Sequence, residues 1–349
     1  MGDGEMTKKM GWEIGQQLDR EKTWIERLMP ERDMLMAAFW GVVVFSVLFL
    51  VGWWLAGNPF EATKRIASPY VKARGWVGTN NWEIIWSVVA LSMLFEFLDA
   101  SAGMGFGTAL TPLLLLIGFD PKQIVPVVMV QQGAAGIVGA FLHNEFQNVE
   151  WKFKPMSETV RLWLIIGGVG LVMVALSVTA VYKVLQLPKI FIQVYVNALL
   201  LFMGLVSLFQ LKRRERKYRP WLMAFFAGLA AFNKGLGGGG YGPVTTVGGI
   251  ISGVPAKAML AVTAISEGTV STFSVLIWLL MLQSGVVIDY ILLPSLMMAT
   301  VFSAVAAPYA IRVFPEKIWA YVVPSYCLIV TALSFYLMAP ELIKALKLG

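Results

Sequence analysis

The sequence predicts an all-α protein that crosses a membrane many times, and three observations lead to this fold class. Hydrophobic residues make up 58% of the 349 residues, charged residues only 14%, and the mean hydropathy is +0.70. Apolar runs of about 20 residues, long enough to span a hydrocarbon core of roughly 30 Å, recur along the chain. A glycine-rich internal repeat divides most of the chain into two related halves. We therefore expect a multi-pass protein of the cell membrane, with two helical repeats.

Nine hydrophobic segments account for the predicted crossings. They cover residues 34–56, 84–117, 123–142, 162–181, 190–211, 221–251, 258–282, 290–311 and 318–338. The segments at 84–117 and 221–251 are each longer than 30 residues and contain the glycine-rich stretches. Each has room for a broken helix or for a hairpin that re-enters and leaves on one side.

Composition shifts divide the chain into four parts. They are an N-terminal amphipathic segment (1–33), an extra transmembrane helix with its linker (34–81), a first transmembrane repeat (82–211) and a second (212–349). In the first part, Ile14, Leu18, Ile25 and Leu28 recur at helical spacing with charges between them. This spacing predicts a helix that lies on the membrane surface, or a solvated helix that packs on its own loops.

The scarce polar chemistry excludes several classes of protein. One cysteine, Cys327, and one histidine, His143, permit neither an internal disulfide nor a Cys/His metal cluster, so we expect no metal and no cofactor. The net charge is +7, but the densest basic run, residues 212–219, lies between two hydrophobic segments and is typical of a topology signal rather than of nucleic-acid binding. No nucleophile, base and orienting group are recognisable, so we do not expect an enzyme.

The repeat appears when the sequence is shifted on itself by 135 residues. Residues 97–133, "FLDASAGMGFGTALTPLLLLIGFDPKQIVPVVMVQQG", then align without a gap with residues 232–268, "FNKGLGGGGYGPVTTVGGIISGVPAKAMLAVTAISEG", and nine of the 37 pairs are identical. The same shift aligns Asp99 with Lys234 and Gln132 with Glu267. Duplication of this kind is common in secondary transporters, whose substrate site lies between the repeats at discontinuous helices.

Glycine-rich breaks at matching places in the two halves are the candidate substrate site. Glycine tolerates positive φ and lets a ligand approach the main chain. We expect the helix to restart at Gly242 or Pro243 in the second half, and at Thr108 in the first half, with Thr111 in its first turn. A restarted helix offers free N–H groups and a partial positive charge to an anion. The candidate binding residues at the breaks are Gly103, Gly105, Gly107, Thr108, Thr111, Gly238, Gly239, Gly240, Tyr241, Gly242, Thr245 and Thr246.

Two other readings of the glycines remain. They permit close helix packing in the GxxxG manner without any ligand. Residues 237–242 also satisfy the G-x-G-x-x-G pattern of nucleotide binding, but that motif requires a preceding strand, whereas an apolar membrane segment precedes it here.

Four ionisable residues, Glu96, Asp99, Lys234 and Glu267, fall inside the predicted membrane segments, where such groups are functional candidates. Asp99 and Lys234 are candidates for an ion pair between the halves; alternatively, Lys234 binds the anion and Asp99 carries a proton. Glu267 is a candidate for proton coupling or for a structural hydrogen bond. We expect Gln131 and Gln132 to line the cavity from a neighbouring helix. His143, at a predicted helix end, is expected at the membrane interface.

The two motifs "SAGMGFGTALTPLLLLIG" and "GLGGGGYGPVTTVGGIISGVP", each followed by a helix that ends in "QQG" or "SEG", resemble the sulfite exporter (TauE/SafE) family of membrane transporters. The resemblance covers roughly residues 82–340, and the GGGG-x-G-P pattern of the second half is its most specific part. The first half departs from the fuller glycine run at Ala102, Met104 and Phe106. The resemblance implies movement of a small sulfur-containing or organic anion, such as sulfite, a sulfonate like sulfoacetate, or a related oxyanion.

Two topologies are compatible with the segments. If each glycine-rich segment crosses the membrane once, the repeats are parallel, the basic stretches at 64–74 and 212–219 face the cytoplasm, and residues 1–33 lie outside. If each forms a hairpin, the repeats are inverted, and segment length favours this form.

The predicted function is a secondary transporter that moves the anion by alternating access. The alternatives are an anion channel, a proton-coupled cation antiporter that uses Asp99 and Glu267, and a membrane enzyme or assembly factor. The predicted partners are the small anion and the lipid bilayer, with no nucleic acid, and self-association into a homo-oligomer is left open.

Overall fold

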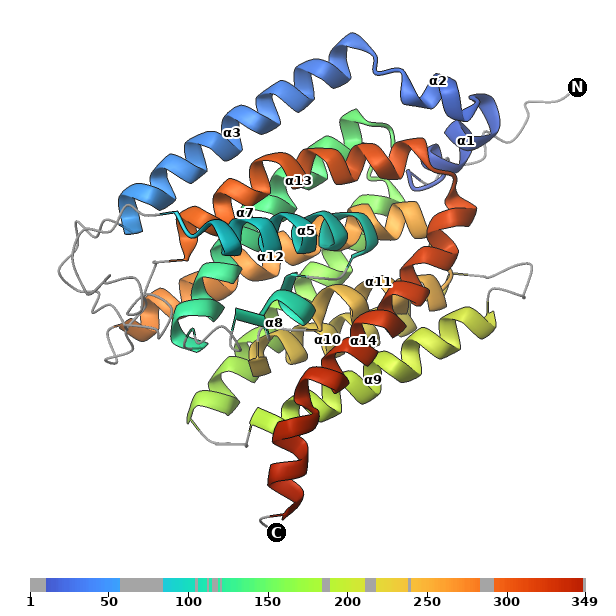
Figure 1. Cartoon of the computed structure of the whole chain (residues 1–349). Coiled ribbons are helices and arrows are strands. Elements are labelled where there is room, and N and C mark those ends of the chain that lie inside the picture. The colour runs from blue at the N-terminus through green and yellow to red at the C-terminus, as the bar shows by residue number, and fades with distance from the viewer. Residues whose placement is uncertain are drawn as a thin grey trace, which may run out of the picture.

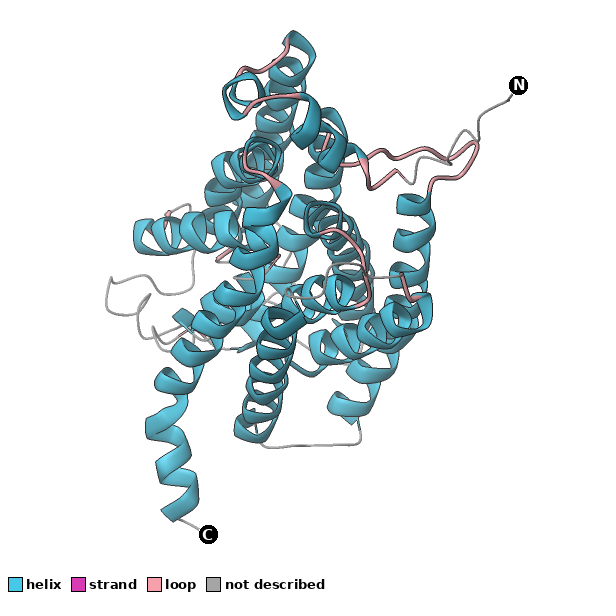
Figure 2. Ribbon diagram, turned by 90° about the vertical axis from the view of Figure 1, so that its right-hand side faces the viewer, coloured by secondary structure: helices cyan, strands magenta, loops and turns pink. Residues whose placement is uncertain are grey.

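The computed structural model describes residues 11–56, 84–103, 106–111, 113–114, 119, 121–183, 189–210, 218–237, 240–282 and 292–347. Within these residues the secondary structure is helical apart from one isolated bridge between Phe153 and Met156 (Figure 2). The helices are α1 (Ile14–Glu21), α2 (Trp24–Leu28), α3 (Arg32–Ala56), α5 (Trp86–Ala102), the π-helix η1 (Phe106–Leu110), α7 (Pro121–Glu145), α8 (Glu158–Lys183), α9 (Lys189–Gln210), α10 (Pro220–Gly237), α11 (Tyr241–Ile251), α12 (Ala256–Leu282), α13 (Leu293–Val313) and α14 (Glu316–Lys347). The predicted all-α class is confirmed.

Every predicted hydrophobic segment contains a helix, and the two longest segments are broken. Six of the described helices, namely α3, α7, α8, α12, α13 and α14, contain a stretch long and apolar enough to cross a membrane. Segment 84–117 holds α5 and η1, and segment 221–251 holds α10 and α11. Since α5 and α10 have only 17 and 18 residues, each reaches the interior of the bundle and ends there at a glycine-rich break.

The helix bounds recur with the 135-residue offset. Adding 135 to the bounds of α5 gives 221–237, against 220–237 for α10, and adding it to those of α7 gives 256–280, against 256–282 for α12. The first residue of η1 corresponds in the same way to the first residue of α11, and the first residue of α8 to that of α13. The two halves therefore consist of equivalent helices in the same order.

The equivalent helices α7 and α12 cross at the centre of the bundle and run in opposite directions. A Cβ at Gly133 would lie 2.9 Å from Thr272 Oγ1, and a Cβ at Gly139 would lie 3.9 Å from the Cβ of Ala264. The residue numbers therefore increase along α7 where they decrease along α12, so the two helices are antiparallel. Between them, Gly136 lies directly on the backbone of Gly268. Small residues that let two backbones touch are typical of helix contacts in membranes, and opposed directions are what an inverted repeat requires.

Each broken helix packs against the other half. In the first half, α5 lies parallel to α13, with Ile85 N donating to Ser295 Oγ at 2.9 Å and Ser303 Oγ to the Met93 carbonyl at 2.8 Å. In the second half, α10 lies along α8, where Ser177 Oγ donates to the Phe232 carbonyl. The broken helix of each half therefore packs against a helix of the other half.

The second glycine-rich segment forms a hairpin. Arg219 N, just before α10, donates to the carbonyl of Ser252, just after α11, at 2.9 Å. The chain thus enters and leaves at the same end of the bundle. Tyr218 at that end contacts Trp12 of the N-terminal segment, with ring centroids 5.2 Å apart, so we call it the α1 end. The described part of the N-terminal segment and the end of the basic run at 212–219 share this end, which differs from the single-crossing scheme, in which residues 1–33 lie on the opposite side.

The N-terminal segment forms two helices rather than the single one expected. A capping box at Thr23 and Glu26 starts α2 and breaks the apolar stripe. Leu18 of α1 is buried against the bundle, whereas Ile25 and Leu28 of α2 are about half exposed (51% and 49%). In Figure 1, α1 and α2 lie together at one end of α3. The segment is therefore docked on the protein through α1 and presents an apolar face outward through α2.

Buried charges fix the docked segment. Asp19 of α1 accepts from Lys257 Nζ at 2.7 Å and from the backbone N–H of Glu316 at 2.6 Å, and it also pairs with Arg27. Arg312, which is fully buried, donates to the Arg27 carbonyl at 3.3 Å. Because Lys257, Arg312 and Glu316 begin or end the helices α12, α13 and α14, this network ties their ends together.

We predict that Gly136→Ala destabilises the protein by about 1–3 kcal/mol or more, because the added methyl meets backbone atoms of Gly268 at 2.6 and 2.7 Å, which cannot move aside as a side chain would. Gly168→Ala, in α8, is the matched control, since nothing lies within 4 Å of its added Cβ. Thermal unfolding in detergent measures both variants. Equal midpoints for the two would show that the α7–α12 contact does not limit stability.

Candidate functional site

The two glycine breaks meet inside the bundle. Gly103 ends α5 with φ +72°, and Gly240 precedes α11 with φ +85°, both in the left-handed region that glycine adopts without strain. A Cβ at Gly103 would collide with the Thr246 hydroxyl, and a Cβ at Gly242 would collide with the Gly103 carbonyl. The breaks therefore need glycine for their contact with each other as well as for their backbone conformation.

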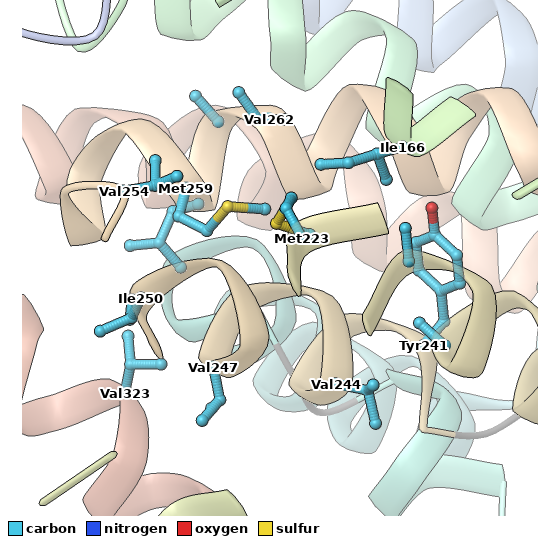
Figure 3. Close-up of a cluster of buried hydrophobic side chains, with 14 of the residues drawn as sticks. Ile166, Met223, Tyr241, Val244, Val247, Ile250, Val254, Met259, Val262 and Val323 are labelled. Carbon is cyan, nitrogen blue, oxygen red and sulfur yellow. The ribbon is translucent and has the colours of Figure 1, made fainter. Parts of the chain in front are cut away.

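The helix after the second break is buried along its length. It begins at Tyr241, one residue before the earliest predicted restart, and Pro243 lies in its first turn, where a missing N–H is tolerated. Figure 3 shows Tyr241, Val244, Val247 and Ile250 along α11, among the buried side chains of neighbouring helices. In the first half, η1 begins at Phe106 rather than at Thr108. Buried hydrophobic contacts therefore hold both restarted helices.

Lys234 is the cation at the centre of the site. Its Nζ, fully buried, donates to Glu267 Oε1 and to Gln132 Oε1, both at 2.8 Å, and lies 5.2 Å from the centroid of the Tyr241 ring. Among the ion pairs of the described residues, Lys234 is joined to Glu267 and not to Asp99, which corrects the expected Asp99–Lys234 pair. Gln132 and Glu267 occupy equivalent places on α7 and α12, so one lysine bridges the two halves.

The carboxyl groups of α5 have different partners. Asp99 Oδ1 accepts from the N–H of Phe106, the first residue of η1, at 3.2 Å. Glu96 Oε2 accepts from Gln131 Nε2 at 2.6 Å, and the same amide nitrogen also donates to Thr300 Oγ1 at 2.9 Å. Glu96 thus joins α5 to α7 and α13 through an amide, and no ion pair of the described residues involves Glu96.

A cavity of about 40 Å³ lies beside these groups. This volume is enough for a few waters, at roughly 10–15 Å³ each, and too small for a sulfonate. Its lining includes Glu96, Asp99, Gly103, Gln132, His143, Thr263, Glu267 and Pro308. The cavity therefore extends from the carboxyl groups towards His143 near the α1 end. His143 lies in the last turn of α7, at a helix end as expected, and is buried beside Asn148.

The structure brings eight of the seventeen predicted site residues together. Asp99, Gly103, Gln132 and Glu267 line the cavity, and Lys234, Tyr241, Gly242 and Thr246 adjoin it through the contacts above. Five other predicted residues are buried but do not line the cavity: Gly107, Thr111, Gln131, Gly240 and Thr245. Gly105, Gly238, Gly239 and the side chain of Thr108 lie outside the described residues.

The region that contains both breaks matches a known protein family. The family model described as "Sulfite exporter TauE/SafE" matches residues 88–335, which is more than two thirds of the chain and includes both breaks. The chain belongs to the TauE/SafE family. Membership confirms the resemblance inferred from the glycine motifs and confirms a multi-pass membrane protein of a transporter family.

One curated relative supports the same class for this TauE/SafE chain. The "Probable membrane transporter protein YtnM" of Bacillus subtilis (strain 168) is 30% identical over 164 residues, which is 45% of this chain. The match spans about half, 51%, of that relative's length. No solved structure matches the chain.

Two residues of this TauE/SafE site, Thr263 and Thr300, were absent from the predicted set. Glu96 was named as a functional candidate because it is an acid in an apolar helix, but no role was assigned to it. Thr263 accepts a hydrogen bond from Thr246 Oγ1 at 2.9 Å, so the Thr246 proton is already engaged. Thr300 supports Gln131 from α13. Buried threonines are common in membrane helices, so the sequence contains no signal for Thr263 or Thr300.

We predict that Lys234→Met costs about 3–5 kcal/mol of stability, because it leaves the Glu267 carboxylate buried without its cation. Adding Glu267→Gln to this variant should recover part of the loss, since the amide carries no charge. Lys22→Met is the control, because its pair with Glu31 is exposed and should contribute at most about 1 kcal/mol. Thermal unfolding of the four proteins in detergent measures the coupling, and a double variant no more stable than Lys234→Met would contradict the buried pair.

Proposed function

We propose that the protein is a secondary transporter for a small sulfur-containing anion, such as sulfite or a sulfonate like sulfoacetate, and that it works by alternating access across the cell membrane. The observation that supports this most directly is the meeting of two glycine breaks, one from each half, beside a buried lysine that both halves bind. Family membership supports the transporter class. The substrate class rests on the chemistry of the breaks and on the family description.

The anion would bind at the second break. The first turn of α11 provides N–H groups that no residue within the helix can satisfy, and its dipole favours negative charge. Asn233 lies beside this turn, 1% exposed, and its amide nitrogen and oxygen have no hydrogen-bond partner. A Cβ at Gly240 would be 3.7 Å from the amide nitrogen, so Asn233 could orient an oxyanion together with Lys234. At the first break, Asp99 already accepts the N–H of Phe106.

Alternating access would arise from relative movement of the interlocked halves. The cavity is too small for the proposed substrate, so the site must widen to admit it. Opening towards one end requires α5 and α10 to shift against α13 and α8, since each broken helix packs on the other half. Small residues at the α7–α12 crossing permit such sliding. The α1 end, which bears Arg219 of the basic run, would face the cytoplasm.

We predict that a substrate anion stabilises the purified protein in detergent. An anion at 100 times its dissociation constant should add about 2.7 kcal/mol. The compounds to compare are sulfite, sulfate, thiosulfate, sulfoacetate, taurine and simple carboxylates, with thermal unfolding as the measurement. Gly240→Val should abolish the selective shift, because its Cβ meets Val196 at 2.9 Å and its φ is +85°. Gly168→Val is the lipid-facing control, which should retain the shift.

Other outcomes distinguish the competing functions. Stabilisation by monovalent cations or by pH alone, with no response to any anion, would contradict the anion site and favour a cation antiporter. Current through single proteins in a planar bilayer, without saturation, would favour an anion channel.

A further inference from the structure

The cavity beside the glycine breaks is lined by acids. Glu96, Asp99 and Glu267 all reach it, and none of its described lining residues is lysine or arginine. Lys234 neutralises Glu267 at 2.8 Å. Among the described residues, no ion pair within 4.0 Å joins Glu96 or Asp99 to a cation, and their recorded partners are the Gln131 amide and the Phe106 N–H. Two carboxyl groups are therefore in excess over the buried cation.

An anion at the second break and two ionised carboxylates in the adjoining cavity repel one another. Like charges repel strongly where water is scarce, and each unpaired buried charge is itself unfavourable. A protonated carboxyl group is uncharged and can donate a hydrogen bond. The state of the site that admits an anion is thus the state in which the excess carboxyl groups carry protons.

We propose that Asp99 and Glu96 are the proton carriers of this transporter, so that the anion and protons cross the membrane together. Each proton comes from water on the side where the anion enters, converts a carboxylate to a carboxylic acid, and returns to water on the other side. No other chemical group is consumed. This inference rests on the proposed function and adds the coupling ion to it.

Asp99 also connects the proton to the backbone break. Its side chain accepts the N–H that opens η1, and its own carbonyl accepts the N–H of Gly103 at 2.7 Å. A protonated carboxyl oxygen is a weaker acceptor than a carboxylate, so protonation loosens the contact between α5 and η1. Gly103 in turn touches Thr246 and Gly242 of the second break. Proton binding at Asp99 therefore alters the backbone beside Gly103, whose contact with Thr246 and Gly242 joins the two breaks.

Charged and titratable groups of the neighbouring elements face these two carboxyl groups. They are Lys234 of α10, Tyr241 of α11, Glu267 of α12, Tyr326 of α14 and, at the far end of the cavity, His143 of α7. Helix α13 contributes the hydroxyl groups of Thr300 and Ser303. Lys234 is the only lysine or arginine in this set, and it is already paired with Glu267. The carboxyl groups of Glu96 and Asp99 therefore remain without a lysine or arginine partner.

The test measures proton and anion movement together in proteoliposomes. The probes are thiosulfate and methanesulfonate, which carry no proton near neutral pH, and a pH-sensitive dye inside the vesicles reports proton flux. In the wild type, an imposed gradient of either probe should drive protons in the same direction. Asp99→Asn and Glu96→Gln should each lower proton flux per anion by about half, because each removes one of two one-proton carriers, and the double variant should abolish it while exchange of labelled anion across the membrane continues. Retained exchange shows that the variants are folded.

Glu31→Gln is the matched control. Glu31 is an exposed carboxylate outside the membrane helices, and its hydrogen bond from Lys22 lowers its pKa. This variant should couple protons as the wild type does. Anion movement without proton flux in the wild type would overturn the inference and leave the proposed function intact. If neither probe moves and sulfite does not move either, the proposed function fails and the inference fails with it.

Discussion

The contact between the two glycine breaks is the constraint on which the rest of the membrane fold depends. Gly103 lies against Thr246 and Gly242 so closely that no side chain fits at either glycine. Both α5 and α10 end there, and every backbone group released by a break must find a partner in protein or in a polar cavity, because lipid offers none. Helix α11 is buried among apolar helices, so protein surrounds the backbone after the second break. The small cavity is the polar space beside both breaks.

Duplication followed by divergence explains the chemistry of the site. Equivalent positions hold Asp99 and Lys234, and equivalent positions on the central helices hold Gln132 and Glu267. A symmetrical pair of halves would place like charges against each other at the centre. Here, one lysine binds both an amide and a carboxylate, so the two central helices are joined by groups of different charge. The order and bounds of the helices repeat between the halves, whereas the charges at the centre do not.

Much of the fold could be predicted because lipid imposes simple rules on the sequence. Every apolar run that was predicted to cross contains a helix, and the offset located both breaks. The pairing of Lys234 could not be predicted, because alignment with Asp99 says only that the two positions are equivalent. Equivalent residues meet only if they lie near the axis that relates the halves, as Gln132 and Glu267 do, and a sequence does not reveal which helices flank that axis. The docking of α1 was missed for a related reason, since Asp19 finds its partners Lys257 and Glu316 more than 230 residues away.

The docked N-terminal segment makes the two ends of the bundle unequal. Asp19 binds the second half at Lys257 and Glu316, and the carbonyl of Gly11 accepts from Glu150 N of the first half at 2.9 Å. One short piece of chain therefore lies like a strap across the seam between the halves. Separating the halves at this end requires buried ion pairs to break or to move as a unit, so the free energy of opening differs between the two faces of an otherwise nearly symmetrical bundle.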